Sequence, residues 1–201
     1  MYLTRAGIVV FSAAVLTGPW YTVGGYSAVG NLISELAAQN TRNNFVMVVG
    51  FLALGLCIVA DGIRQRHRGA IPFIAFGIFM ALAGLFGHKP IDPNLPYSEF
   101  AHKAHSVLAS LAGVSITLAL IWQALRVPTL GIRVITLSVA VLCVALPLAM
   151  LQFPAYQGLI QRFMYLFVFA WLWAGFPAHT ATPSFQTTPR KRAVSVDKGS
   201  G

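Results

Sequence analysis

Six apolar stretches, each close to twenty residues long, recur along the chain and constrain its fold more than any other feature. They cover about residues 6–23, 44–63, 70–87, 101–125, 134–152 and 159–178. A helix needs about 20 apolar residues to cross the hydrocarbon core of a bilayer, and each stretch comes close to that length. The pattern predicts an all-α fold, a polytopic membrane helix bundle of about six transmembrane helices over residues 1–178.

The composition excludes a soluble domain. Hydrophobic residues make up 57% of the chain and charged residues only 9%, whereas about 25% of the residues of a typical soluble domain are charged. The formal net charge is +9, but the basic residues stand mostly between the apolar stretches and not on one soluble face with interleaved aromatic residues. We therefore expect membrane lipid as a partner and no nucleic acid.

The basic residues also predict an orientation. If each apolar stretch spans the membrane, ten of the 14 Lys and Arg residues fall on one side. They are Arg5, Arg64, Arg66, Arg68, Arg126, Arg133, Arg190, Lys191, Arg192 and Lys198. Because cytoplasmic loops are enriched in Lys and Arg, we expect both termini in the cytoplasm. The loops 24–43, 88–100 and 153–158 are then expected to face outward.

Residues 179–201 differ from the rest of the chain. They are rich in Thr, Ser and Pro and include the basic run Arg190, Lys191 and Arg192. A segment of this composition cannot bury an apolar core. We expect a disordered basic cytoplasmic tail.

The first predicted outer loop combines apolar and polar residues. Leu32, Ile33 and Leu36 make it too apolar for a freely solvated loop, yet Ser34 and Glu35 lie among them. One interpretation is a short interfacial or re-entrant helix that caps the bundle, because irregular backbone at membrane depth must be covered by protein or line a wet cavity. The other is an amphipathic loop resting on lipid headgroups.

The second predicted outer loop holds the densest group of ionisable residues. His88, Asp92, Glu99, His102 and His105 fall within eighteen residues. On a helix that starts near residue 98, the last two histidines share a face, and the prolines of the loop can fold the first histidine and the aspartate back toward them. Imidazole and carboxylate groups suit zinc with an open position for water. The alternatives are a hydrogen-bonded polar cluster and plain interfacial residues.

Other polar and small residues have local interpretations. Asp61 precedes Arg64 by one helical turn and is expected to form an ion pair with it. Arg162 opens the sixth stretch, and we expect it either to reach lipid headgroups or to turn inward and pair with Glu35 or Asp92.

Small residues at helix-packing spacing, Gly77 with Ala81 and Ala109 with Gly113, predict close helix contacts.

Three motifs together resemble the membrane family catalogued as domain of unknown function 998. They are NLISELAAQ, FGHKPIDP followed by AHKAH, and GLIQRFMYLFVFAWL. The resemblance covers roughly residues 6–178 and implies about six spans. Since the family is bacterial and archaeal, it also implies a bacterial or archaeal cytoplasmic (inner) membrane. The family's motifs map onto Ile33, Ser34, Glu35 and Leu36, onto Asp92, onto His102 or His105, and onto Gly158, Leu159 and Arg162. The resemblance implies a shared outward-facing polar site and carries no activity with it.

These residues lead to two main hypotheses about function. In the first, an outward-facing site handles a lipid or small amphiphile, with metal-assisted hydrolysis as one form of it. Its candidate catalytic residues are Ser34 and Glu35, as nucleophile or base, together with Asp92, His102 and His105. Zinc is the candidate cofactor, with these last three residues and His88 as candidate ligands, and Arg162 is the candidate headgroup-binding residue.

In the second hypothesis the protein is a non-catalytic subunit that docks other membrane-protein subunits. A transporter is the third choice, because the middle of each stretch is apolar, whereas transporters place ionisable groups near the bilayer midplane.

Overall fold

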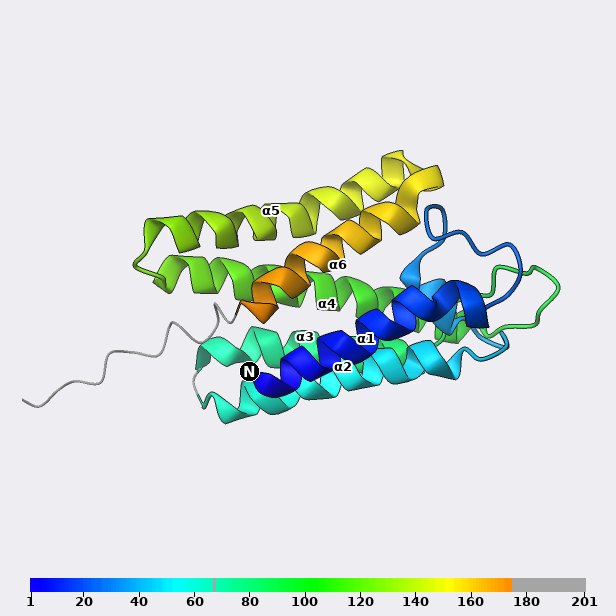
Figure 1. The fold of residues 1–201 in the computed structure, drawn as a ribbon, viewed down its shortest axis with the longest axis horizontal. Helices are drawn as coiled ribbons and strands as arrows, with labels where there is room; N and C mark the ends of the chain where they lie inside the picture. Colours follow the sequence, from blue (N-terminus) through cyan, green and yellow to red (C-terminus); the bar gives the residue numbers. More distant parts are fainter. Residues whose placement is uncertain (67, 175–201) are drawn as a thin grey trace, which may run out of the picture.

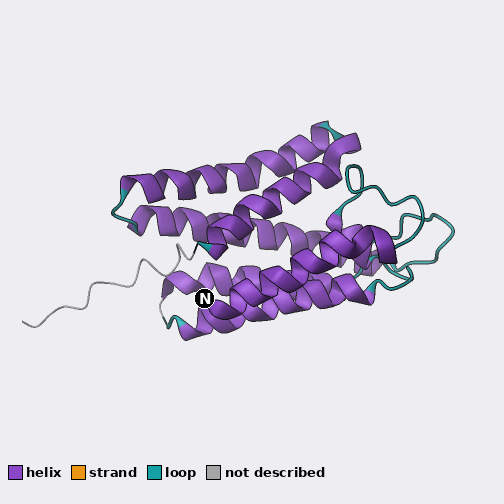
Figure 2. Cartoon of the chain, viewed as in Figure 1, coloured by secondary structure: helices purple, strands orange, loops and turns teal. Residues whose placement is uncertain are grey.

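The computed structural model describes residues 1–66 and 68–174, and all regular structure in these ranges is helical (Figure 2). Six α-helices coincide with the six predicted stretches, which confirms the predicted all-α bundle. They are α1 (Tyr2–Tyr21), α2 (Phe45–Arg64), α3 (Ile71–Leu85), α4 (Glu99–Arg126), α5 (Leu130–Gln152) and α6 (Gln157–Trp173). Short 3-10 helices, labelled η, cover Ile33–Ala37 (η1), Arg68–Ala70 (η2) and Pro154–Tyr156 (η3).

The helices have the length and hydropathy of membrane spans. Five helical stretches, which include α1 to α5, are long and apolar enough to cross a bilayer. Helix α6 has 17 residues, at the lower end of the range of about 17–25 residues for a span. The chain is therefore a multi-pass membrane protein. The predicted end of the sixth span at 178 and the predicted tail lie outside the described residues.

Helices that follow one another in the chain pack side by side (Figure 1). Most of the irregular chain, residues 22–44 and 86–98, gathers at one end of the bundle together with the turn between α5 and α6. We call this the loop end. The three loops predicted to share one side of the membrane thus lie together, and the N-terminus lies toward the opposite end (Figure 1).

Glycine contacts set the closest helix pair. A Cβ atom on Gly55 of α2 would overlap the carbonyl oxygen of Gly77 on α3 and lie 2.7 Å from the backbone nitrogen of Ala81. The contact predicted for Gly77 and Ala81 is confirmed, since small residues allow the two backbones to touch. The same prediction is wrong for Ala109 and Gly113, because a Cβ on Gly113 would meet nothing within 4 Å.

A buried carboxylate ties two helices at the opposite end. The Oδ2 atom of Asp61, near the end of α2, accepts hydrogen bonds from the backbone N–H and the hydroxyl of Thr4, at 2.8 and 2.9 Å. It therefore caps the first turn of α1, whose N–H groups lack partners within the helix. The predicted ion pair with Arg64 is also present, at 3.8 Å. The bond to Thr4 has no signal in the sequence.

Candidate functional site

The second loop and α4 place three histidines together. Ser98 caps α4 by accepting a hydrogen bond from the backbone N–H of Ala101 at 3.3 Å, which confirms the predicted helix start. His105, one of the buried residues of α4, lies with its Nδ1 atom 2.8 Å from the carbonyl oxygens of both Ala83 and Phe86. A helix leaves its last carbonyl groups without partners, and this imidazole satisfies two of them at the end of α3.

His88 packs against both histidines of α4. Its ring centroid is 4.5 Å from that of His102 and 5.6 Å from that of His105, so the loop folds back as predicted for this residue. The Nδ1 atom lies 3.0 Å from the carbonyl oxygen of Lys89. Burial lowers the pKa of His88 from 6.5 to about 4, because a low-dielectric environment disfavours the charged imidazolium. The ring is therefore neutral at pH 7.

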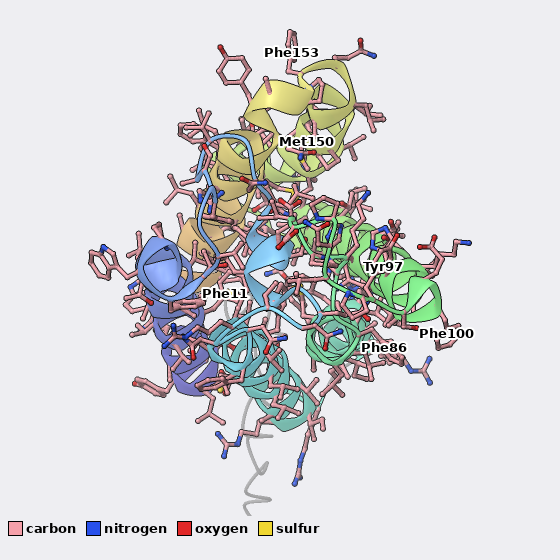
Figure 3. All side chains as sticks on the ribbon, turned by 90° about the vertical axis from the view of Figure 1, so that its right-hand side faces the viewer. Phe11, Phe86, Tyr97, Phe100, Met150 and Phe153 are labelled. Carbon is pink, nitrogen blue, oxygen red and sulfur yellow. The ribbon has the colours of Figure 1, made fainter. Side chains whose placement is uncertain are left out.

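The first loop reaches the same place from the other side. Helix η1 buries Ile33, Ser34, Leu36 and Ala37, and it lies over the centre of the bundle when the molecule is viewed from the loop end (Figure 3). The predicted capping helix is confirmed. The alternative of a loop resting on headgroups is wrong for this segment, because a surface loop would not be buried by protein.

Glu35 has a local role in this loop. Its carboxylate accepts a hydrogen bond from the backbone N–H of Leu32 at 2.6 Å, which holds the start of η1. At the same turn the backbone N–H of Ile33 donates to the Oε1 atom of Gln161 at 2.6 Å. Glu35 does not line the cavity that Ser34 lines. Its position fits a structural role in the loop, and the catalytic role expected for it stays a prediction.

Ser34, His88 and His105 line one cavity of about 190 Å³ at the loop end. We call it the histidine chamber. Its other polar lining residues are Ser106, Gln161 and Tyr165, and its apolar ones are Leu32, Phe51, Met80, Ala83 and Ala109. The lining thus joins η1, His88 of the second loop, His105 of α4, and α6. It contains no Asp, Glu, Lys or Arg among the described residues.

The other predicted metal ligands do not join this cavity. Asp92 turns to its own loop, where its Oδ1 atom accepts hydrogen bonds from the backbone and side-chain nitrogens of Asn94 at 2.9 and 3.0 Å. The Nδ1 atom of His102 accepts from the backbone N–H of Lys89 at 3.4 Å. Within the described ranges, no group of three or more His, Cys, Asp or Glu residues is arranged to hold a metal ion. The predicted zinc set of Asp92, His102 and His105 is therefore not assembled in the described structure, and the carboxylate bonds within its own loop instead.

Arg162 holds the first loop through neutral groups. Its Nη1 atom donates to the carbonyl oxygens of Ala28 at 2.7 Å, Asn31 at 3.1 Å and Gly158 at 2.9 Å, and its Nη2 atom donates to the hydroxyl of Tyr26. The prediction that it pairs with Glu35 or Asp92 is wrong in the described structure, whose ion pairs do not include it. One guanidinium satisfies several carbonyl groups because it carries five N–H donors.

Gly158 explains why the loop comes so close to α6. A Cβ atom at this position would overlap the carbonyl oxygen of Asn31 and lie 2.9 Å from that of Ala28. The next residue, Leu159, donates its backbone N–H to the carbonyl oxygen of Val29 at 2.9 Å. The Gly-Leu-x-x-Arg motif therefore acts as a docking surface for the first loop.

Comparison with known proteins now gives the chain a family. A family model described as "Protein of unknown function (DUF998)" matches residues 5–176. The chain belongs to this family. No curated protein and no solved structure shows significant similarity to it. The resemblance read from the three motifs is thereby confirmed, and what this DUF998 protein does must be argued from its own site.

Three lining residues of this DUF998 protein were missed by sequence reasoning. Ser106 lies one residue after His105, and Gln161 lies beside Arg162. Tyr165 looks like one more aromatic residue of an aromatic span, and its hydroxyl donates to the sulfur of Met80 at 3.7 Å. Of the three, only Gln161 could have been identified from the sequence, because a polar side chain near the start of an otherwise apolar helix indicates a polar contact.

Two apolar grooves adjoin the chamber in this DUF998 protein. The first, of about 530 Å³, lies between α3, α4, α5 and α6, and we call it the α4/α5 groove. It shares Met80, Ala109 and Tyr165 with the histidine chamber. The second, of about 510 Å³, lies between α1 and α6, and we call it the α1/α6 groove. It shares only Tyr165 with the chamber.

Proposed function

We propose that this protein binds an uncharged amphiphile of the membrane, with the polar group in the histidine chamber and the hydrocarbon chain in the α4/α5 groove. The observation that carries the proposal is a cavity lined by Ser34, His88 and His105 that shares three lining residues with an apolar groove. Together the two volumes, about 190 and 530 Å³, fall within the range of about 300–1,000 Å³ typical of ligand sites.

Unused hydrogen-bonding capacity in the chamber supports the binding of a polar group. In the described structure His88 and His105 bond to carbonyl oxygens through Nδ1, which leaves each Nε2 atom as an acceptor. In the described ranges the Ser34 hydroxyl and the NH₂ group of Gln161 donate no hydrogen bond to the protein, and neither is a fully buried atom without a partner. Both groups are therefore open to a ligand in the cavity that they line. A ligand with hydroxyl, ester or amide groups would satisfy these atoms.

The charge of the chamber supports an uncharged ligand. Its lining has no permanently charged side chain in the described ranges, and the lowered pKa of His88 keeps that ring neutral at pH 7. A charged ligand group would be moved from water into this enclosure without a counter-ion, which is strongly unfavourable. Neutral donors and acceptors favour a neutral polar group.

The open space along α4 supports a chain beside that group. Ala109 and Gly113 lie on one face of α4, line the groove and do not serve as a helix contact. The lining is otherwise made largely of aliphatic side chains from membrane helices. An apolar lining of this kind favours contact with a hydrocarbon chain over contact with a polar group.

Catalysis is not part of the proposal. The Ser34 hydroxyl has no hydrogen bond to an imidazole in the described part of the chain, although an activated serine lies within hydrogen-bond reach of its base. The chamber also lacks the carboxylate of the predicted zinc set. The subunit and transporter hypotheses stay predictions from the sequence.

The test uses purified protein in mild detergent and 1-oleoylglycerol, an uncharged monoacylglycerol, as the probe. We expect the probe to raise the thermal unfolding temperature of the wild type in a saturable way. Gly113→Leu fills the groove without a clash, since a Cβ there meets nothing within 4 Å, and it should abolish the shift. Gly131→Leu is the matched control, because Gly131 is equally open and lies outside both cavities.

A second variant tests the chamber. Ser34→Ala removes the hydroxyl and adds no bulk to the chamber, and loss of one hydrogen bond of about 0.5–1.5 kcal/mol predicts up to about tenfold weaker binding. Equal shifts in the wild type and in Gly113→Leu would show that the probe acts through the detergent micelle and would overturn the proposal. So would the absence of any saturable shift in the wild type.

A further inference from the structure

The α1/α6 groove contains a charged residue in its lining, which the α4/α5 groove lacks in the described ranges. Its floor contains the buried rings of Phe11 and Phe169. Its rim is formed by Leu16, Phe163 and Leu166, whose exposed fractions are 76%, 47% and 58%. Exposed side chains of this kind on a membrane helix face lipid. The groove is therefore open to hydrocarbon from the side.

Arg162 is the charged residue of this lining in the described structure. It lies five residues after the start of α6, which places it about 8 Å along the helix from the loop end. That depth is close to the level of lipid headgroups, where a long basic side chain is stable.

The positive charge of Arg162 has no carboxylate partner in the described ranges. It donates hydrogen bonds to three carbonyl oxygens and to the hydroxyl of Tyr26, and all four groups are neutral. Glu35, the acidic residue of the first loop, accepts a hydrogen bond from the backbone N–H of Leu32 and forms no ion pair with Arg162. Neutral acceptors stabilise the guanidinium through their dipoles and leave its net charge uncompensated.

We infer that the α1/α6 groove is a binding site for an anionic phospholipid. One acyl chain lies along Phe11 and Phe169 between the two helices, and the phosphate lies against the guanidinium of Arg162. The free N–H donors of Arg162 match phosphate oxygens. This site shares only Tyr165 with the histidine chamber among the described residues, and the inference does not depend on the proposed function.

The charge of the headgroup is tested by comparing two lipids with identical chains. Purified protein is titrated with phosphatidylglycerol or with phosphatidylcholine in detergent, and bound lipid is counted by native mass spectrometry. We expect the wild type to bind phosphatidylglycerol at least about tenfold more tightly, which corresponds to about 1.4 kcal/mol. Equal binding of the two lipids would overturn the inference. Inorganic phosphate should not compete, because it lacks the chain.

The place of the chain is tested with two variants on α1. Ser12 lines the groove, and Ala13 is exposed on the same helix outside it. Ser12→Phe should remove the preference for phosphatidylglycerol, whereas Ala13→Phe should keep it. Replacing Arg162 itself, as in Arg162→Gln, would also release the first loop and could prevent folding. The two α1 variants avoid this problem because they leave Arg162 and its bonds to the loop in place. Retention of the preference in Ser12→Phe would refute the site.

Discussion

At the scale of single residues, His88 combines a buried position with an uncharged ring. Two other imidazoles, His102 and His105, lie against it, and its neighbour Lys89 adds a positive charge nearby. Burial is the larger cause of its lowered pKa, and these groups add to it. The ring can accept a hydrogen bond from a ligand at neutral pH, which a protonated imidazole cannot.

This position predicts a pH dependence of stability. The folded-state pKa of about 4 lies below the ordinary value of 6.5, so between these pH values the unfolded chain binds a proton that the folded chain does not. Stability is therefore full above about pH 6.5 and falls as the pH is lowered toward about 4. We expect a lower unfolding temperature at pH 4.5 than at pH 7 in detergent-purified protein.

The His88→Gln variant should show a weaker pH dependence between pH 7 and 4.5. His102→Gln serves as the control because it keeps the titrating ring and removes only a minor cause of its lowered pKa, so it should weaken the pH dependence much less. An unchanged pH dependence in His88→Gln would contradict the assignment.

The sequence predicted which residues belong to the site better than it predicted how their side chains are arranged. Ser34, His88 and His105 were predicted as site residues and line one cavity. Asp92 belongs to the same loop as His88 but bonds to Asn94. A proline-rich loop can turn a side chain in several directions, and the sequence alone does not indicate the direction. Likewise, Gly77 and Gly113 both stand in small-residue pairs, and only the neighbouring helix decides that one makes a contact and the other lines a groove.

At the scale of elements, the first loop is held between two partners. Arg162 and Gly158 of α6 bind its first half. Its second half is tied to the other loop by Gln39, whose side-chain amide exchanges hydrogen bonds with Ser98 and also donates to the carbonyl oxygen of Gly87 at 2.7 Å. These bonds satisfy backbone groups that have no partner within a helix. The chamber keeps its shape because both of its covering loops are fixed.

The docking of the loop on α6 predicts that Gly158→Ala destabilises the protein. The added methyl group overlaps a backbone oxygen, which cannot move as a flexible side chain can, and overpacking of this kind costs about 1–3 kcal/mol. We expect a lower unfolding temperature and faster proteolysis in the first loop. Gly113→Ala is the control. It adds the same methyl group in open space on a helix and should be neutral or stabilising.

At the scale of the whole molecule, the fold was predictable because the bilayer sets the length of each span. All six predicted stretches correspond to helices. The ends shift by a few residues, since the caps at Ser98 and Asp61 and the loop contacts decide where each helix begins or stops. The bond from Asp61 to Thr4 and the bonds from Arg162 to the first loop could not be predicted, because they join residues far apart in the chain.

The distribution of basic residues predicts that the loop end faces outward. This is tested by cysteine labelling in a background with Cys57→Ala and Cys143→Ala. Asn94→Cys at the loop end should react with a charged, membrane-impermeant maleimide on intact bacterial cells. Thr129→Cys, exposed between α4 and α5 at the opposite end, should react only after the cells are permeabilised. The reverse pattern would show the opposite orientation.

The bonds between Arg162 and the first loop also set an order for biosynthesis. Arg162 and Ala28 are 134 positions apart, so the loop leaves the ribosome long before its partner on α6 has been made. Until α6 enters the membrane, the carbonyl groups of Ala28 and Asn31 depend on water for hydrogen bonds. A helix made late in translation therefore fixes the first loop, and the chamber is complete only when translation has passed through α6.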